Sequence, residues 1–576
     1  MSAIHAISAL NEVIAPLMPH LMLAPILLPL LTAALMLLMG EDQQRTKLTL
    51  NMASTLLGLG VSVALLGWAG QQGPASTMDV YLAGNWPAPF GIVLALDRLS
   101  AMMLVLTSTI ALASAMFAAA RWHRAGVHFH PLFQLQLMGL CGAFLTADLF
   151  NLFVFFEIML AASYGLLLHG SGRVRVQSGL HFIAINLAAS SLFLIGASML
   201  YGITGTLNMA DLAQGIPQVA EADRGLLHAA AGILATAFLI KAAVWPLNFW
   251  LVPAYSAATA PVGALFALMT KVGIYVILRL WLLLFGLDAG PSAHFGSLWL
   301  IVGGMLTMAF GAIGMLGSQR LGYLAGYGAI VSSGTLLAAA GFGQPLLTAG
   351  LLYYLPSSTL AISALFLLAD LMDRWRNDGA SLAPFDHDDA PFLTAELMPV
   401  KGLNLDDDEE VLTGRVIPAA VALLGLGFMA CTLVIAGLPP LSGFVGKFAM
   451  LTALLNPSGL GLSGGQAPGA AGWTLLTLLI GTGLLALIAL TRAGILHFWA
   501  TYDRASLQLR VLEGLPIAFL LGACVLLTLQ AGPVMGYMQA TADALHTPEL
   551  YVRAVMSARP IPGPQAPRAE PAQEAP

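Results

Sequence analysis

Apolar residues occupy the chain in runs of about 20, separated by short polar stretches. Each run is long enough to cross a hydrocarbon layer about 30 Å thick as a helix. The pattern predicts fourteen helices, at about 21–40, 48–69, 98–119, 131–147, 148–168, 179–201, 226–256, 260–284, 296–316, 321–342, 346–370, 416–455, 473–496 and 511–533. We therefore expect an all-α polytopic membrane protein.

Two of these runs are too long for one straight helix, and both contain helix-breaking residues. In 226–256 the breaker is Pro246, and in 416–455 it is the pair Pro439 and Pro440. Transporters use such breaks in corresponding places of repeated units. The discontinuous helices are the seventh and the twelfth, which predicts two five-helix repeats, spans 4–8 and 9–13. The second repeat is inverted because five is odd. Proline kinks that only serve packing are the alternative.

Composition and charge support this interpretation. Hydrophobic residues make up 58% of the 576 residues and charged residues 9%, with a mean hydropathy of +0.84. Soluble domains carry about 25% charged residues, so soluble classes are excluded. Positive charge is enriched in cytoplasmic loops. With both termini outside, the near-membrane basic residues of the outer loops are Arg98, Arg224 and Arg553, and those of the inner loops are Arg45, Lys47, Arg121, Arg124, Arg173, Arg175, Arg320, Arg374, Arg376, Lys401, Arg415, Arg492, Arg504 and Arg510.

The segments between the helices complete the predicted domain organisation. We expect an outside loop with short extended strands at 70–97 and an acidic inside insert at 373–415. The full division is an N-terminal segment 1–20, three helices in 21–130, a first repeat 131–284, a second repeat 285–510, a last helix 511–533 and a Pro/Ala-rich tail 534–576. No nucleotide, metal or nucleophile motif occurs in the sequence. We expect no cofactor, no nucleic-acid partner and no enzymatic activity.

Four charged residues stand in the middle of apolar runs: Glu157, Lys241, Lys271 and Lys447. Each opposes insertion by roughly 2.5–3.5 kcal/mol, a cost that indicates function. A carboxylate and an amine brought together offset each other's desolvation, so Glu157 and Lys241 are predicted to titrate as a coupled pair. Lys271 lies in the next helix, and Lys447 follows the second break. Together they predict a proton path, to which His181, at the start of the sixth span, is a possible accessory.

Three runs carry a resemblance to a known family. Phe150 to Gly165, Lys241 to Leu251 and Ala436 to Lys447 resemble the proton-translocating membrane subunits shared by respiratory NADH:quinone oxidoreductase and Mrp-type cation/proton antiporters. The outside-loop run Gly84 to Ile92 is more particularly similar to the D-type subunits of Mrp antiporters. The resemblance covers about residues 20–533.

The resemblance implies fourteen helices with two inverted five-helix repeats, and it implies roles. Glu157 is the essential acid, Lys241 its partner at the broken helix, Lys271 the connecting base and Lys447 the terminal group of the second channel. It also implies a hetero-oligomer with other Mrp subunits in the bacterial inner membrane. That complex exchanges internal sodium or potassium for external protons and serves pH homeostasis.

One departure from the family concerns the eleventh span. Many relatives carry a histidine where this chain has Ser357 and Ser358, and a relay through hydroxyls and water is the expectation there. Two other functions stay open. A proton-pumping subunit of a respiratory oxidoreductase or membrane hydrogenase shares the chain of charges. A structural scaffold subunit is a rival of another class, although a scaffold has no use for buried charges.

Overall fold

The computed structural model describes residues 18–71, 78–124, 126, 128–170, 172–380, 419–457, 468–499 and 509–560. Most of the predicted N-terminal segment, the acidic insert from 381 onward and the end of the tail lie outside the described residues. The described part is mostly helical, which confirms the predicted all-α class.

Helices account for nearly every apolar run. Eleven of the described helices are long and apolar enough to cross a membrane. The main helices are α3 Ala24–Leu38, α4 Gln44–Gln71, α5 Arg98–Ala120, α6 Phe129–Leu145, α7 Leu149–Leu168, α8 Arg173–Thr204, α10 Glu221–Lys241, α12 Ala260–Leu284, α13 Ser297–Gly317, α14 Leu321–Gly341, α15 Pro345–Ala380, α16 Ala419–Ala436, α17 Ser442–Leu455, α18 Ala470–Gly494, α19 Val511–Leu529 and α20 Ala531–Leu545. Shorter helices are α2 Met18–Leu21, α9 Met209–Gly215, α11 Leu251–Ala257 and α21 Pro548–Met556.

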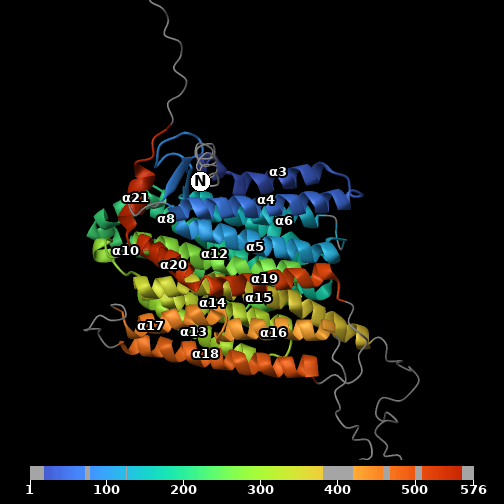
Figure 1. Ribbon diagram of the computed structural model, residues 1–576. Coiled ribbons are helices and arrows are strands. Elements are labelled where there is room, and N and C mark those ends of the chain that lie inside the picture. The colour runs from blue at the N-terminus through green and yellow to red at the C-terminus, as the bar shows by residue number, and fades with distance from the viewer. Residues whose placement is uncertain are drawn as a thin grey trace, which may run out of the picture.

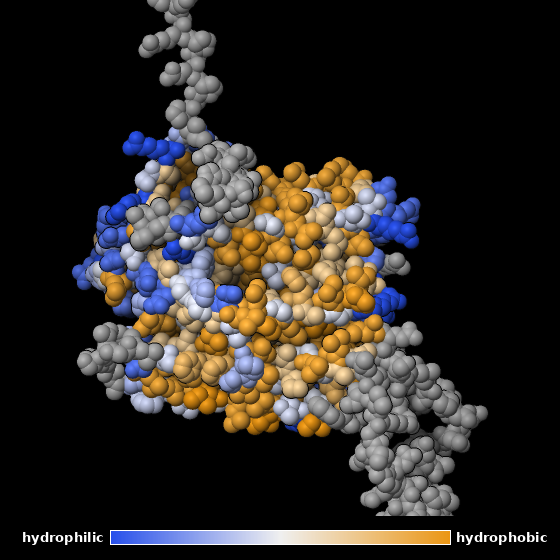
Figure 2. Space-filling view, viewed as in Figure 1, coloured by the Kyte–Doolittle hydropathy of each residue, from blue (hydrophilic) through white to orange (hydrophobic). Residues whose placement is uncertain are grey.

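The long helices lie side by side in one bundle (Figure 1). Chain order runs from α3 and α4 at one edge to α18 at the other, and α19 and α20 return to pack against α5 and α15 in the middle. Figure 2 shows a broad hydrophobic band over the middle of the visible face and hydrophilic residues gathered at the two ends of the helices. Such a band between polar ends is what a bilayer requires of a spanning bundle.

One end of the bundle carries a two-stranded antiparallel sheet, and we call it the hairpin end. Strand β1, Asp79–Leu82, pairs with β2, Val93–Leu96, with Asp79 opposite Leu96. Both strands lie in the segment predicted to hold short extended strands. Helices α9 and α21 lie at the same end, where α21 contacts both α9 and β1. The strand β2 leads directly into α5, whose N-cap is Asp97.

Both predicted breaks are present. Helix α10 ends at Lys241, and the chain resumes a helix only at α11; α16 ends at Ala436, and α17 starts at Ser442. The two breaks share one hydrogen-bond pattern. Val244 N–H donates to the Leu239 carbonyl at 3.0 Å, and Leu438 N–H donates to the Leu433 carbonyl at 2.9 Å. These six-residue closures belong to the Schellman motif, which needs a left-handed residue at the turn.

Ala243 and Gly437 supply that left-handed residue, with φ values of 55° and 78°. Aligning these two positions also aligns Pro246 with Pro440. Glycine adopts this conformation without steric cost, whereas alanine does so at a cost of about 1–2 kcal/mol. The first break has a further support, because Trp245 N–H donates to Thr307 Oγ1 of α13 at 2.9 Å.

The C-terminal region contains two helices that were not predicted from the sequence. The predicted tail began at 534, but α20 and α21 extend helical structure to Met556. Both helices bury apolar side chains at helical spacing, Met538, Ala542 and Leu545 in α20 and Tyr551 and Val555 in α21. The apolar faces of these helices are too short for a crossing, so a search for 20-residue runs does not find them. The helix α15 likewise continues past the predicted start of the insert at 373.

Candidate functional site

Glu157 lies midway along α7 and is half-buried. Its Oε1 accepts a hydrogen bond from Ser190 Oγ of α8. Ser190 is itself buried. The carboxylate therefore sits at the edge of the bundle, with its described hydrogen-bond partner on the neighbouring helix.

Lys241 is the last residue of α10 and is 6% exposed. Its Nζ donates to Asn186 Oδ1 at 3.3 Å and lies 5.8 Å from the centre of the Phe156 ring. The orientation of Asn186 is fixed because its Nδ2 donates to the Phe182 carbonyl at 2.8 Å. The negative end of a helix dipole also favours a cation at this position.

The predicted pairing of Glu157 with Lys241 takes an indirect form. Among the described residues, three ion pairs fall within 4.0 Å, and none of them joins these two side chains. The two charges are nevertheless close enough to interact electrostatically. Asn186 and Ser190, one turn apart on α8, hold the ammonium and the carboxylate respectively. The helix α8 thus connects the two charges through its own polar side chains.

Lys271 lies in α12, where that helix touches the end of α10. A Cβ built at Gly273 would lie 2.8 Å from the backbone nitrogen of Ala242, so the two backbones are in direct contact beside the two lysines. The Lys271 side chain is fully buried. Its Nζ donates to Ser333 Oγ at 3.2 Å and reaches the Ala329 carbonyl at 3.5 Å, both on α14.

Paired serines continue from α14 toward the second break. Ser332 and Ser358 share a hydrogen bond of 2.9 Å between α14 and α15, and Ser357 and Ser442 share one of 2.7 Å between α15 and the first residue of α17. All four hydroxyls are buried. Tyr354, one turn before Ser357 and Ser358 on α15, is also buried. The eleventh span therefore carries hydroxyls at the centre of the bundle.

Lys447 lies in α17, but its amine reaches back across the break. Nζ donates to the carbonyls of Ala436 at 2.9 Å and Ile435 at 3.3 Å, at the end of α16. When the breaks are aligned, Ile435 takes the place of Lys241. An ammonium therefore lies at the end of the first half-helix in both breaks. At the end of α10 it belongs to the last residue of that helix, Lys241, and at the end of α16 it belongs to Lys447 of α17. Gly437 is essential to this contact, because a Cβ there would collide with the Lys447 side chain.

His181 is not brought to this group. Its ring is exposed on α8, and Nδ1 is 2.9 Å from the Gln177 carbonyl of the same helix. The residues that sequence reasoning missed are Asn186 and Ser190. Their signal was two polar residues four positions apart in the apolar run 179–201, which places them on one face of the helix.

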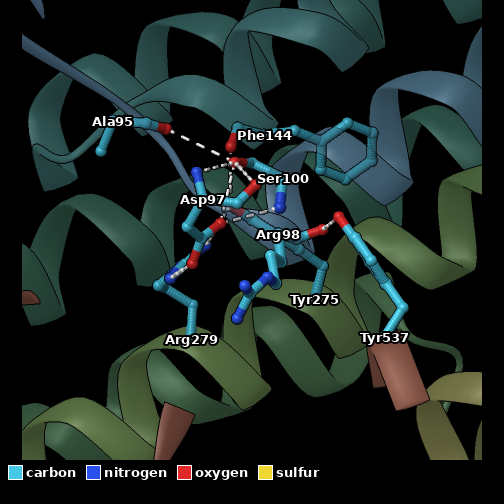
Figure 3. Close-up of polar contacts among 8 residues, drawn as sticks. All are labelled: Ala95, Asp97, Arg98, Ser100, Phe144, Tyr275, Arg279 and Tyr537. Carbon is cyan, nitrogen blue, oxygen red and sulfur yellow. Dashed lines mark hydrogen bonds and ion pairs between the residues drawn. The ribbon is translucent and has the colours of Figure 1, made fainter. Parts of the chain in front are cut away.

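A second ionic centre, at the hairpin end, was also missed. Arg279 of α12 donates to both oxygens of Asp97, with Nη1 at 2.6 Å from Oδ2 and Nη2 at 2.7 Å from Oδ1. Figure 3 shows this pair beside Ser100 and Tyr275, and Tyr537 bonded to the Arg98 carbonyl nearby. Bidentate pairs of this kind are strong and directional. The pair fastens the start of α5 to α12.

The charge state of Asp97 follows from its neighbours. Burial raises the pKa of this carboxyl, but the adjacent Arg279 guanidinium and hydrogen bonds from Ser100 outweigh burial and hold the pKa below its ordinary value. Asp97 is therefore ionised at neutral pH and neutralises Arg279 locally. A closed pair of this kind has a structural role at the hairpin end.

Comparison with known proteins gives the family. The family model described as "NADH:quinone oxidoreductase/Mrp antiporter, TM" matches residues 146–385. A protein of Rhizobium meliloti, named as the probable D subunit of a K⁺/H⁺ antiporter, is 54% identical over 94% of this chain and 98% of its own length. The D subunit of a Na⁺/H⁺ antiporter of Alkalihalophilus pseudofirmus is 33% identical over 94% of this chain and 100% of its own.

The fold agrees with these relatives. A chain in the structure of the Mrp complex from Dietzia sp. superposes with a TM-score of 0.77 and 25% identity, covering 94% of this chain and 100% of that one. The outside-loop run and the two broken helices, on which the sequence resemblance rested, lie in the matched length. The chain belongs to the family of antiporter D subunits within the NADH:quinone oxidoreductase/Mrp antiporter membrane proteins.

Proposed function

We propose that this chain is the D subunit of a multisubunit monovalent cation/proton antiporter that exchanges Na⁺ or K⁺ for protons. The relatives with 33% and 54% identity over 94% of the chain are named as such subunits. The chain works in a hetero-oligomer with other antiporter subunits of the Mrp type, in the inner membrane of a bacterium. It acts as part of a secondary transporter and not as an enzyme.

The observation that carries this proposal is the set of charges inside the bundle, the half-buried Glu157 and the three buried lysines, which we propose form one line. The line runs from Glu157 through Lys241 and Lys271 to Lys447, and the hydrogen-bond partners of each ammonium among the described residues are neutral oxygens. An ammonium without a carboxylate gives up its proton more readily than one in an ion pair. Glu157 exchanges protons at the bundle edge, the lysines pass charge inward, and the serines bridge Lys271 to Lys447.

The chain crosses the membrane fourteen times in this proposal, with two inverted five-helix repeats at 131–284 and 285–510. The matching breaks support it: Ala243 and Gly437 occupy the same position in the same hydrogen-bond motif. If α10 with α11 and α16 with α17 count as one crossing each, every predicted span contains a described helix, and α2, α9, α20 and α21 lie mostly or wholly outside the spans. In this proposal both ammonium sites lie near mid-membrane, where transporters with broken helices bind their ions.

The hairpin end faces the outside in this arrangement. Arg98, Arg224 and Arg553 all lie at that end, and the members of the larger basic set that fall among the described residues lie at the other. The bias of positive charge toward the cytoplasm supports this orientation. A redox-driven pump shares the line of charges, but the relatives of high identity are antiporter subunits. A scaffold has no need of three buried lysines, which oppose insertion by roughly 2.5–3.5 kcal/mol each.

The proposed function predicts cation-driven proton movement by the complete complex. The complex containing this chain is purified, reconstituted into vesicles that enclose a pH-sensitive dye, and exposed to a gradient of Na⁺ or K⁺. We expect proton flux opposite to the flux of at least one cation, with no electron donor present. Flux no greater than in protein-free vesicles for both cations would contradict antiport, and flux that requires an electron donor would indicate a pump.

A further inference from the structure

A second polar cluster lies away from the line of charges, between α3, α4 and α6. Its members are Thr32 of α3, Asn51, Ser54 and Thr55 of α4, and Gln134 of α6, all of which are buried. The proton path described above does not use any of them. They belong to α3, α4 and α6, and neither of the two helix breaks lies in these helices.

Direct hydrogen bonds join the cluster. Gln134 Nε2 donates to Asn51 Oδ1 at 2.6 Å and to Thr55 Oγ1 at 3.1 Å. Gln134 Oε1 accepts from Ser54 Oγ at 3.2 Å, and Ser54 Oγ accepts from Thr32 Oγ1 at 3.0 Å. Helix association does not account for so many polar groups, because polar contacts between membrane helices contribute on average only about 0.6 kcal/mol each.

A small cavity adjoins the cluster. Its volume is about 20 Å³, which is room for one water-sized guest. Its lining residues with side-chain oxygens are Ser54, Thr55, Ser62, Thr107, Ser108 and Gln134. Pro25 and Pro29 also line it, and the carbonyl of Pro25 lacks its usual helix donor because Pro29 has no N–H.

This lining has the chemistry of a site for a dehydrated monovalent cation. Neutral hydroxyl, amide and carbonyl oxygens replace the hydration shell of such ions in selective pores. The described residues that line the cavity include no carboxylate, which disfavours divalent cations because these are bound through carboxylates. The size of the cavity excludes a cation that keeps its water shell.

His130 connects this cavity to protons. Its Nδ1 is 3.0 Å from Asn51 Nδ2. Asn51 Oδ1 accepts from Gln134, so the NH₂ group of Asn51 faces the His130 ring. His130 Nδ1 must therefore accept the hydrogen bond from Asn51. A proton added to Nδ1 turns it into a donor. Asn51 must then turn its oxygen to the ring, and Gln134 must turn its oxygen to Asn51. Gln134 Nε2 then faces Ser54 and the cavity.

The surroundings of His130 set how this switch responds to pH. The titratable groups that act electrostatically on its ring are His123, His169 and Lys47. The His123 ring is 5.9 Å away, and His169 Nε2 is held 2.9 Å from the Trp122 carbonyl. The pKa of His169, which follows α7, is lowered by burial despite that bond. Burial lowers the pKa of His130 too, to about 3. Both rings are therefore neutral over most of the range in which histidines titrate, and His130 takes up a proton only at a lower pH.

We propose that the cavity beside Ser54, Thr55 and Gln134 binds a dehydrated monovalent cation, and that protonation of His130 weakens this binding by turning Gln134. The proposal rests on the proposed antiport function and locates the exchange of cation for proton in this chain. When Gln134 turns, its donor Nε2 replaces its acceptor Oε1 at the cavity. The site then loses an oxygen that binds the cation, and the cation is released.

Removing one cavity oxygen tests the site. The reconstituted complex carries Thr55→Val, which keeps the shape of the side chain, and the control is Thr49→Val, an exposed residue of the same helix. We expect Thr55→Val to raise the apparent KM for Na⁺ or K⁺ at least about tenfold, with the maximal rate retained and Thr49→Val unchanged. An unchanged KM for both cations overturns the site. If Thr55→Val does not assemble, Ser62→Ala gives the same test from the other side of the cavity.

His130→Gln tests the switch, because glutamine cannot take up a proton. Because burial lowers the pKa of His130 to about 3, the apparent cation KM of the wild-type complex should rise as the pH falls toward that value. In His130→Gln we expect a KM that stays constant over the same fall in pH, and a wild-type dependence overturns the switch. Loss of all antiport by the wild type would defeat the proposed function instead, so the two failures are distinguishable.

Discussion

Replacing Glu157 with glutamine should reduce cation-driven proton flux roughly 10²-fold or more, to the level of protein-free vesicles. Glutamine keeps the size of the side chain and still accepts the hydrogen bond from Ser190. It cannot release or take up a proton, so the line of charges loses its carboxylate. The measurement is the initial rate of dye response in vesicles that contain equal amounts of assembled complex.

The matched control for this prediction is Glu221→Gln. Glu221 is an exposed acid in the first turn of α10 and lies outside the line of charges. We expect the control to keep the wild-type rate. Wild-type flux in Glu157→Gln would remove Glu157 from the pathway and with it the coupled pair.

Replacing Lys271 with methionine should abolish flux and leave the complex as stable as the wild type or more so. Lys271 is fully buried, and its described acceptors are Ser333 and the Ala329 carbonyl. Replacing a buried charge with an apolar side chain of similar volume is often neutral or stabilising, by about 1–4 kcal/mol. Activity and stability therefore move in opposite directions. Thermal unfolding of the detergent-solubilised complex is measured together with flux.

A conservative variant separates charge from proton exchange at the same position. Lys271→Arg keeps a cation, but a guanidinium does not deprotonate in proteins. We expect this variant to be inactive as well. Loss of both assembly and flux in Lys271→Met, with full activity in Lys271→Arg, would show that Lys271 has a structural role.

Much of the fold could be predicted from the sequence because a bilayer imposes a simple length rule. Runs of about 20 apolar residues predict helices, and the structure has a helix at each of them. Pro246 and Pro440 predicted the breaks because proline cannot continue the hydrogen-bond ladder. The four charged residues stood out because charge inside an apolar run is costly.

The remainder could not be predicted because it depends on which helices are neighbours. Asn186 and Ser190 are ordinary polar residues until α8 is placed between Glu157 and Lys241. Arg279 lies near the end of an apolar run, and its partner Asp97 is 182 positions away in the chain. The aligned positions of Lys241 and Lys447 differ in sequence, and only the reach of Nζ to Ile435 and Ala436 brings the two ammonium groups to equivalent places.

The Ser357–Ser358 pair shows both what could be predicted from the sequence and what could not. The sequence indicated a hydroxyl relay at this point, and both serines are buried. Their partners, Ser442 and Ser332, come from two other helices. No periodicity in the chain identifies these partners. The role of the serines in proton movement stays a prediction.

The central claim is that one proton path runs the whole length of the line of charges. Its most direct test is the initial rate of cation-driven proton flux through the assembled complex with Lys447→Met, the position farthest along the line from Glu157. A single path predicts that this rate falls to the protein-free background, as in Glu157→Gln. A rate equal to that of the wild type would contradict the account.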